Sequence, residues 1–167
     1  MKTIVMGCLM LWAGSGHSQD LHAVRSLYLE AGSSERACQD LLSKTRSCAE
    51  ADAIMMGYGG AAAMIMAKHV INPLTKLDWF RQGKELLDKA LLMDGRSAEL
   101  HYLRYCIQRN CPRFLGYSGN VPADREFLFH FLEGNGDSEL KMMIHAALTK
   151  DPSVRKPLPS IKTDKAR

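Results

Sequence analysis

Three residues in the C-terminal part of the chain have the types and spacing of a metal half-site. Glu126, His130 and Glu133 recur at i, i+4 and i+7, so a helix would place two carboxylates and an imidazole on one face. Such a face can hold one side of a carboxylate-bridged metal pair, and a second helix of the same kind must supply the other side. No other histidine has comparable neighbours along the chain, which leaves the alternative of a solvated histidine between two surface acids.

Methionines form a second group with metal-binding chemistry, because thioethers together with histidine can hold copper(I) in an oxidising compartment. The residues concerned are Met55, Met56, Met64, Met66, Met142 and Met143. The first four fall within one apolar helical stretch, where methionine is a flexible filler of the core. Periodicity explains these residues without a metal, and we predict no cofactor.

Four cysteines follow the first eighteen residues: Cys38, Cys48, Cys106 and Cys111. They allow three disulfide pairings. If one helix carries Cys38 and Cys48, about 15 Å separate them along its axis, whereas a disulfide needs Cα atoms within about 7 Å. A Cys106–Cys111 bond requires only that the helix end between them. Bridges between other segments and buried unpaired thiols stay open as alternatives.

Local catalytic motifs are missing from the sequence. It contains no HExxH zinc motif, no GxSxG nucleophile elbow, no phosphate-binding P-loop and no dinucleotide glycine fingerprint. We therefore expect a protein without enzymatic activity.

One connection between predicted helices, residues 111–121, is long and carries large apolar side chains beside a basic one. Such side chains either pack back on the core or form a contact surface. The candidate contact surface consists of Arg109, Arg113, Phe114, Leu115 and Tyr117.

The net charge of +4 lies outside the body of the chain. Of 22 basic and 18 acidic residues, residues 19–150 hold 16 of each, and residues 151–167 hold five basic and two acidic ones. A nucleic-acid-binding protein concentrates basic charge on a folded face, so we predict no nucleic-acid partner. The length of 167 residues and the 46% hydrophobic content fit one globular domain.

The first eighteen residues have the pattern of a secretory signal peptide. Lys2 precedes an apolar run at 4–13, and Gly16 and Ser18 occupy the small positions before a cleavage at Gln19. The apolar run before Cys8 is too short for a lipoprotein anchor. We predict an exported protein, periplasmic or extracellular, with no transmembrane segment in the mature chain.

Helical periodicity and turn residues divide the rest of the chain into seven segments, which begin near residues 20, 35, 52, 75, 97, 122 and 137. No strand pattern appears. We predict an all-α domain over 19–151, built as a stack of about six to seven antiparallel helices. Residues 152–167 form a basic tail without an apolar period, for which we predict disorder.

Small residues are concentrated in the third segment, residues 52–71. Gly59, Ala63 and Ala67 recur every four residues and would let a neighbouring helix approach closely. Gly57, Gly59 and Gly60 each cost about 1 kcal/mol relative to alanine inside a helix. Either close packing or a ligand that needs bare backbone must offset this cost.

Residues 78–110 resemble the tetratricopeptide repeat. Phe80, Gly83, Leu87, Ala90 and Asp94 follow the apolar, small and turn positions of the second helix of that repeat, and residues 97–103 look like the start of the next one. No full 34-residue period can be traced. The segments 99–105 and 114–117 are also similar to small exported bacterial proteins of unknown function.

The resemblance implies helical hairpins that present a concave face to a protein or peptide partner. Our expectation is an exported, non-enzymatic interaction module. The alternative is a small metal- or cofactor-binding helical protein of the cell envelope, which would use the Glu126–His130–Glu133 face or the methionines.

Overall fold

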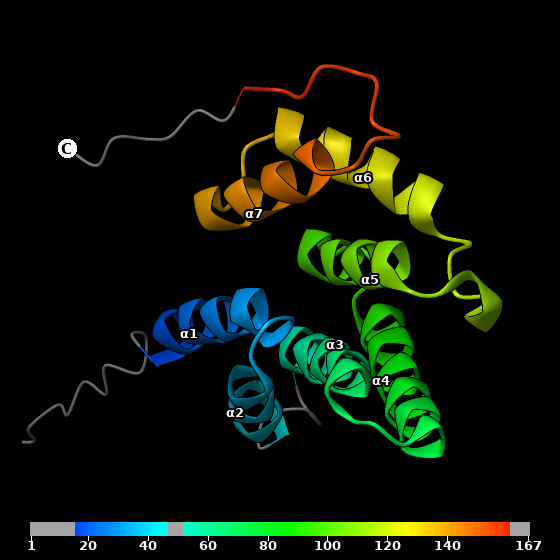
Figure 1. Cartoon of the computed structure of the whole chain (residues 1–167). Helices are drawn as coiled ribbons and strands as arrows, with labels where there is room; N and C mark the ends of the chain where they lie inside the picture. The colour runs from blue at the N-terminus through cyan, green and yellow to red at the C-terminus, as the bar shows by residue number, and fades with distance from the viewer. Residues whose placement is uncertain (1–15, 47–51, 161–167) are drawn as a thin grey trace, which may run out of the picture.

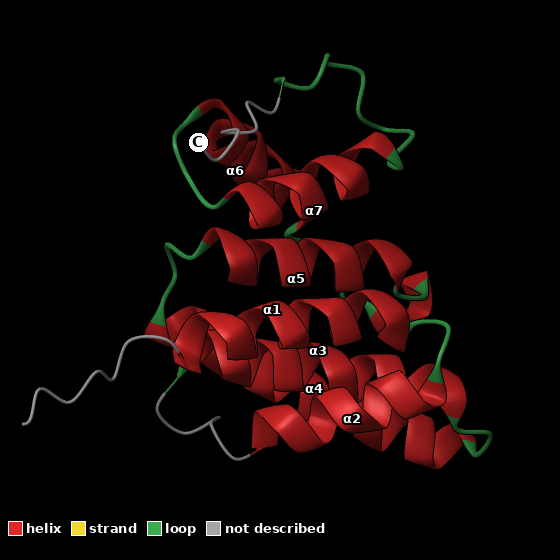
Figure 2. Cartoon of the chain, turned by 90° about the vertical axis from the view of Figure 1, so that its left-hand side faces the viewer, coloured by secondary structure: helices red, strands yellow, loops and turns green. Residues whose placement is uncertain are grey.

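The computed structural model describes residues 16–46 and 52–160, and this part of the chain contains helices and loops but no strand (Figure 2). The helices are α1 (Gly16–Ala31), α2 (Glu35–Arg46), α3 (Ala53–His69), α4 (Pro73–Met93), α5 (Ala98–Asn110), α6 (Val121–Glu133) and α7 (Ser138–Thr149), with a short 3₁₀ turn, η1, at Arg113–Leu115. The all-α prediction is confirmed. None of the described helices is both long and apolar enough to cross a membrane.

The helices form two layers (Figure 1). The odd-numbered helices make an inner arc in which α3 contacts α1 and α5, and α5 contacts α7. Each even-numbered helix lies outside this arc and packs on the helices that precede and follow it in the chain. Lys68 and His69 at the end of α3 bond to the carbonyls of Gly32 and Ala31 at the end of α1. The inner helices therefore run in one direction, and the outer helices return the chain.

Side-chain caps define where the helices begin, because the first backbone N–H groups of a helix have no partner within it. Ser97 and Asp137 accept from these groups at the starts of α5 and α7, as the sequence suggests. The helix predicted to begin near residue 75 begins at Pro73. Asn72 caps this helix, α4, and Pro73 occupies the first turn, where its missing N–H costs nothing.

The closest helix contact in the structure is between α3 and α4. A Cβ atom on Gly60 would lie 2.7 Å from the carbonyl oxygen of Gly83 and 2.7 Å from the nitrogen of Leu87. Gly59 faces Thr45 of α2 instead, where a Cβ would lie 3.1 Å from the hydroxyl. The glycines of α3 therefore meet neighbouring helices, and close packing accounts for their cost.

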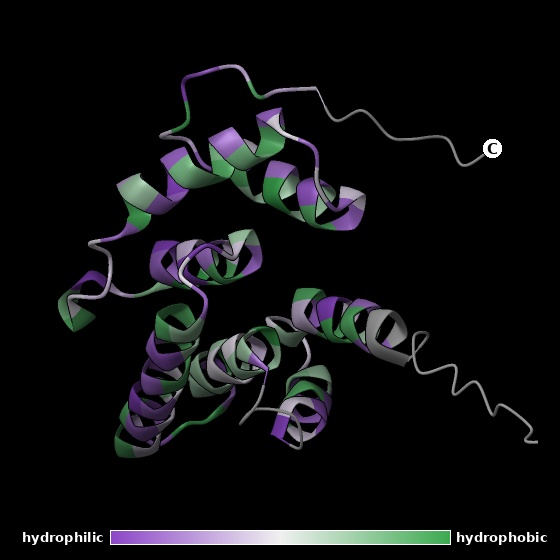
Figure 3. Cartoon of the chain, turned by 180° about the vertical axis from the view of Figure 1, so that it is seen from behind, coloured by the Kyte–Doolittle hydropathy of each residue, from purple (hydrophilic) through white to green (hydrophobic). Residues whose placement is uncertain are grey.

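α3 and α4 differ in how many polar residues they carry. Seen from behind in Figure 3, α4 carries hydrophilic patches along its length, whereas α3 is pale to green. Twelve consecutive residues of α3, Met55 to Met66, are buried. This is the central helix of the fold, and it has no polar face because α1, α2, α4 and α5 surround it.

The C-terminal segment follows α6 and α7 beyond the predicted domain boundary at 151. Asp151 is buried, and Val154 and Leu158 pack against the core. The Lys156 ammonium lies 5.4 Å from the centre of the Phe129 ring. Residues 152–160 therefore contact the folded helices, because the apolar side chains of Val154 and Leu158 cover part of the core surface. The rest of the predicted tail, most of the predicted leader including Cys8, and Cys48 lie outside the described residues.

Candidate binding groove

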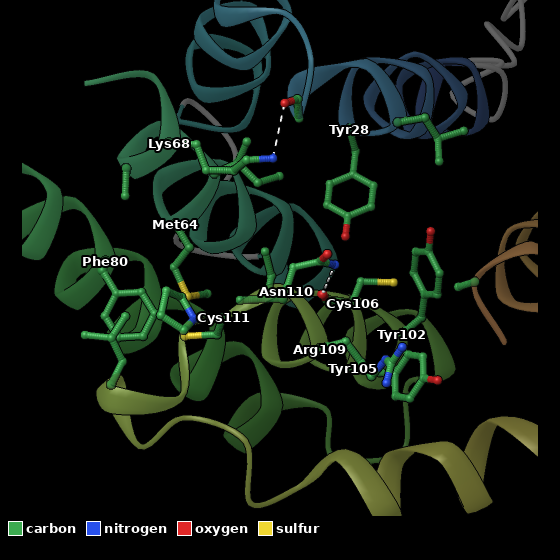
Figure 4. Close-up of a pocket in the computed structure, with 18 of the residues that line it drawn as sticks. Tyr28, Met64, Lys68, Phe80, Tyr102, Tyr105, Cys106, Arg109, Asn110 and Cys111 are labelled. Atoms are coloured by element: carbon green, nitrogen blue, oxygen red, sulfur yellow. Dashed lines mark hydrogen bonds between the residues drawn. The ribbon is translucent and has the colours of Figure 1, made fainter. Parts of the chain in front are cut away.

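A groove of about 1090 Å³ lies on the inner side of the arc (Figure 4). α1 and α7 form its two walls, α5 forms its floor, and α3, the start of α4 and the η1 turn close one side. No Cα atom of α1 lies within 8 Å of one in α7. The volume is at the upper limit of small-molecule pockets, which hold about 300–1,000 Å³.

The lining is mainly apolar and aromatic, and five helices contribute to it. The main apolar and aromatic residues are Tyr28, Leu29, Met64, Ile65, Leu77, Phe80, Tyr102, Tyr105, Cys106, Ile107, Phe114, Leu115, Met142 and Met143. Leu29, Phe114 and Met142 are exposed at the rim, with Phe114 86% exposed. Exposed apolar side chains gathered around a concave surface mark a binding site more often than scattered ones do.

Basic residues gather at the end of the groove where the inner helices terminate. Lys68, Lys76, Arg109 and Lys150 belong to the lining. Arg109 forms an ion pair of 2.8 Å with buried Asp151. Within the described residues, the three lysines have no ion-pair partner. The charge at this end is therefore positive and available to a ligand.

The opposite end of the groove is held by one buried guanidinium. Arg25 of α1 donates two hydrogen bonds of 2.8 Å to Glu99 of α5, and its third nitrogen contacts Asp137 at 2.7 Å and Glu139 at 2.8 Å. The Tyr58 hydroxyl donates to Glu99 at 2.6 Å. Burial opposes the charge of Asp137, but the hydrogen bonds from Arg25 and from the backbone N–H groups of Leu140 and Glu139, together with the charge of Arg25, outweigh it and lower the pKa of this carboxyl.

A second buried polar cluster lies behind the groove, between α5 and α6. Asp124 is fully buried and accepts from Arg104 at 2.6 and 2.8 Å and from His101 at 2.7 Å. Burial alone would raise its pKa, yet the bonds from Arg104 and His101 lower it. His101 also stacks on Phe127 with 4.1 Å between ring centres. These contacts fix α6 on α5 and do not reach the groove lining.

The predicted metal face is present but points away from the groove. His130 contacts Glu126 at 3.3 Å and Glu133 at 3.5 Å, so the helical spacing brings the three residues together as predicted. All three are exposed on α6, and each ring nitrogen faces a carboxylate of the same helix. In the described part of the chain, no group of three or more His, Cys, Asp and Glu side chains has a metal-binding arrangement.

The methionines divide between core and groove. Three of them are buried residues of α3: Met55, Met56 and Met66. The other three line the groove: Met64, Met142 and Met143. The sequence treats all six as one group, but their helices place only three of them on a shared surface.

The predicted contact surface is divided in the same way. Tyr117 is 8% exposed and packs edge-on against Phe80 with 5.7 Å between ring centres, so it belongs to the core. Phe114 and Arg113 are exposed, and Leu115 is half-buried. Arg109, Phe114 and Leu115 join the groove lining, where they extend its rim.

The cysteines of the described chain are unpaired thiols: Cys38, Cys106 and Cys111. Cys38 is buried and donates to the carbonyl of Ala62. Cys106 and Cys111 line the groove (Figure 4). Burial raises the pKa of Cys106 to about 11, so it is a neutral thiol at physiological pH. The disulfide alternatives that involve Cys48 fall outside the described residues.

Most of the groove residues escape recognition in the sequence because they come from five helices. One signal was available on α5, where Tyr102, Cys106 and Arg109 recur at i, i+4 and i+7 beside the apolar stripe that faces the core. A second apolar or aromatic face on one helix indicates either a second packing partner or a ligand surface.

The fold and the groove define an all-α protein with a layered helical arc and an open apolar concave face. No family model, curated protein or solved structure matches the chain. The likeness to the tetratricopeptide repeat therefore stays a prediction. Of the five residues that carry it, Gly83, Leu87 and Ala90 are buried on the side of α4 that packs inward.

Proposed function

We propose that this protein is an exported, non-enzymatic binding module whose groove takes an apolar segment of a protein or peptide. The observation that carries the proposal is the groove of about 1090 Å³, open between α1 and α7 and lined by apolar and aromatic side chains. An isolated protein gains nothing from keeping Leu29, Phe114 and Met142 in water, whereas a ligand that covers them gains their burial.

The chemistry of the lining supports binding rather than catalysis. Its tyrosines and thiols are held in their neutral forms, because burial raises the pKa of Tyr28, Tyr102, Cys106 and Cys111. A nucleophile or general base needs the opposite shift, toward the operating pH. These side chains therefore offer neutral, mainly apolar surface to a ligand.

Binding at the groove can be tested with the apolar dye 8-anilinonaphthalene-1-sulfonate. We expect the folded protein to bind one or a few dye molecules with enhanced fluorescence. The variant Met142→Asp places a charge on the groove rim at a residue 49% exposed, and should weaken dye binding at least fivefold.

The matched control is Leu92→Asp, which alters a residue 88% exposed on α4 that does not line the groove. It should bind the dye as the parent does. Equal loss in both variants, or no loss in either, would remove the groove from the proposal.

Export is tested separately by expressing the chain with its own first eighteen residues in a bacterium with a cell envelope. Intact mass of the purified protein should begin at Gln19. A chain that keeps Met1 would contradict the export part and leave the groove part standing.

A further inference from the structure

We infer that the occupant of the groove is an amphipathic α-helix of a partner protein, with acidic side chains at the end that meets Lys68, Lys76 and Lys150. This inference rests on the proposed function and names the partner by its shape and charge. Three observations carry it: the helix-sized gap in the inner layer, the lack of backbone partners in the lining, and the unpaired basic charge.

The gap has the form of a missing helix. Each inner helix within the arc lies between two others, since α3 contacts α1 and α5, and α5 contacts α3 and α7. Only α1 and α7 end the arc, and they face each other across the groove without backbone contact. A helix seated between them would pack on both walls and on the floor.

The length of the gap corresponds to about three helical turns along α7 and about one turn along α1, of which Tyr28 and Leu29 line the groove. The lining residues of α7 run from Glu139 to Lys150, which spans about 16 Å at 1.5 Å per residue. A helix of this length presents apolar anchors at i, i+3 or i+4, and i+7, the pattern by which helices bind in grooves. Met64, Met142 and Met143 suit this role because flexible thioether side chains adapt to the shape of an anchor.

A helical ligand also satisfies the hydrogen bonds of its own backbone. The walls and floor of the groove are helices, whose internal backbone groups already bond to one another. The Asn110 amide in the lining donates to the Cys106 carbonyl at 2.7 Å, so it is engaged as well. An extended peptide would bury N–H and C=O groups without partners here, whereas a helix satisfies its own.

Charge sets the direction of the partner helix. Lys68, Lys76 and Lys150 are exposed and have no ion-pair partner within the described residues, while the single lining carboxylate, Glu139, is bonded to Arg25 and His22. A partner with acidic residues at the lysine end gains attraction, and one with basic residues there meets like charge.

The test uses two synthetic 14-residue helical peptides with the same leucine face, one with four glutamates at its C-terminal end and one with four lysines there. Binding is followed through the methyl signals of ¹³C-labelled methionine in the full chain. We expect the glutamate peptide to shift Met64, Met142 and Met143 saturably and to bind at least tenfold more tightly than the lysine peptide. Met55, Met56 and Met93, which do not line the groove, are internal controls.

Variants separate charge from stability. The double variant Lys68→Gln/Lys150→Gln should reduce the tenfold preference to less than threefold, while Lys89→Gln, on the outer helix α4, should leave it unchanged. If the lysines serve only the ends of their own helices, the double variant lowers the melting temperature without changing the preference, and that result overturns the charge inference.

The remaining outcomes are equally decisive. Equal binding of both peptides overturns the charge part and keeps the groove as a binding site. Equal binding of a glutamate peptide with two central prolines overturns the helical occupant. Shifts with palmitate but with neither peptide assign the groove to a small amphiphile instead. Failure of the dye experiment, by contrast, overturns the proposed function itself.

Discussion

α3 and α4 meet so closely that backbone contacts backbone, whereas α1 and α7 face each other at a distance and are joined through the side chain of Arg25. In the first contact neither Gly60 nor Gly83 places a side chain between the two helices, so the backbone of one lies against the backbone of the other. In the second, a guanidinium and the carboxylates of Asp137 and Glu139 lie between them. Both arrangements fix a distance, one by removing atoms and the other by inserting charged groups.

The two contacts explain how a small helical protein keeps a concave face open. Apolar walls tend to close on each other because closure removes them from water. An ion cluster at one end resists closure, since its charges must keep their partners and cannot be pressed into apolar surface. The closed contact leaves no room for a ligand, whereas the open one keeps apolar surface exposed to it.

The largest expected effect comes from breaking the link across the groove. Arg25→Met leaves Glu99 buried without its cation, which should lower the free energy of unfolding by about 3–5 kcal/mol. Urea denaturation followed by circular dichroism measures the change. Arg36→Met is the control, because Arg36 is exposed and its contact with Asp40 is 4.0 Å.

The double variant Arg25→Met/Glu99→Gln should recover part of this loss, because it removes both charges of the buried pair. If the single variant Arg25→Met is as stable as the parent, the link across the groove contributes nothing to the free energy of unfolding.

The next effect tests the closed contact. Gly83→Ala places a Cβ atom 2.8 Å from the nitrogen of Met64, and backbone cannot rotate away as a side chain can. We expect a net loss of about 1–3 kcal/mol despite the better helix propensity of alanine. Gly119→Ala, where the added atom meets nothing within 4 Å, should change stability by less than about 0.5 kcal/mol.

Acid should weaken both the Arg25 cluster, through Asp137, and the Arg104 cluster, through Asp124. Folding lowers the pKa of Asp124 and Asp137, so their contribution is complete above the ordinary carboxyl pKa of about 4 and is lost as pH falls through the lower folded values. The melting temperature should therefore decrease when the pH is lowered beyond about 4. Asp124→Asn should be less stable at pH 7 and lose less on acidification, while exposed Asp78→Asn should follow the parent.

A smaller effect on stability is expected at the groove rim. Phe114→Ser removes a side chain that is 86% exposed and should change the free energy of unfolding by less than about 0.5 kcal/mol. Dye binding should nevertheless weaken severalfold, because this ring covers one edge of the groove. A large loss of stability would place Phe114 in the core and remove it from the rim.

The smallest effect is expected at the exposed triad of α6. His130→Ala should alter neither stability nor dye binding, because its two contacts of 3.3 and 3.5 Å are with exposed carboxylates. Equilibrium dialysis against zinc chloride should detect no stoichiometric zinc that depends on His130. Zinc lost specifically in this variant would revive the metal-binding alternative.

Helix positions were predictable wherever a cap or breaker stood in the sequence. Ser97 and Asp137 begin helices where their types indicate, and Pro122 lies in the first turn of α6. The start of α4 lies slightly before the predicted residue 75, because Asn72-Pro73 caps this helix directly after α3 ends. The Glu126–His130–Glu133 face was predictable because it depends only on helical spacing within α6.

The groove was not predictable in the same way, since its lining is contributed by several helices. Tyr28, Met64 and Met142 are separated by many residues and meet only because the inner helices run in one direction. Arg25 shows the same limit, because no local feature distinguishes it from the other arginines. Its role follows from Glu99, Asp137 and Glu139 converging on it.

Periodicity and capping act over a few neighbouring residues, and they are sufficient to predict the helical class and most helix starts. The small residues of the third segment indicated either close packing or a ligand. Tertiary packing determines which small residues meet, which apolar side chains stay in water and which charges are buried together. Those outcomes depend on contacts between distant segments. The groove is such an outcome, formed where two helices at opposite ends of the arc are held apart.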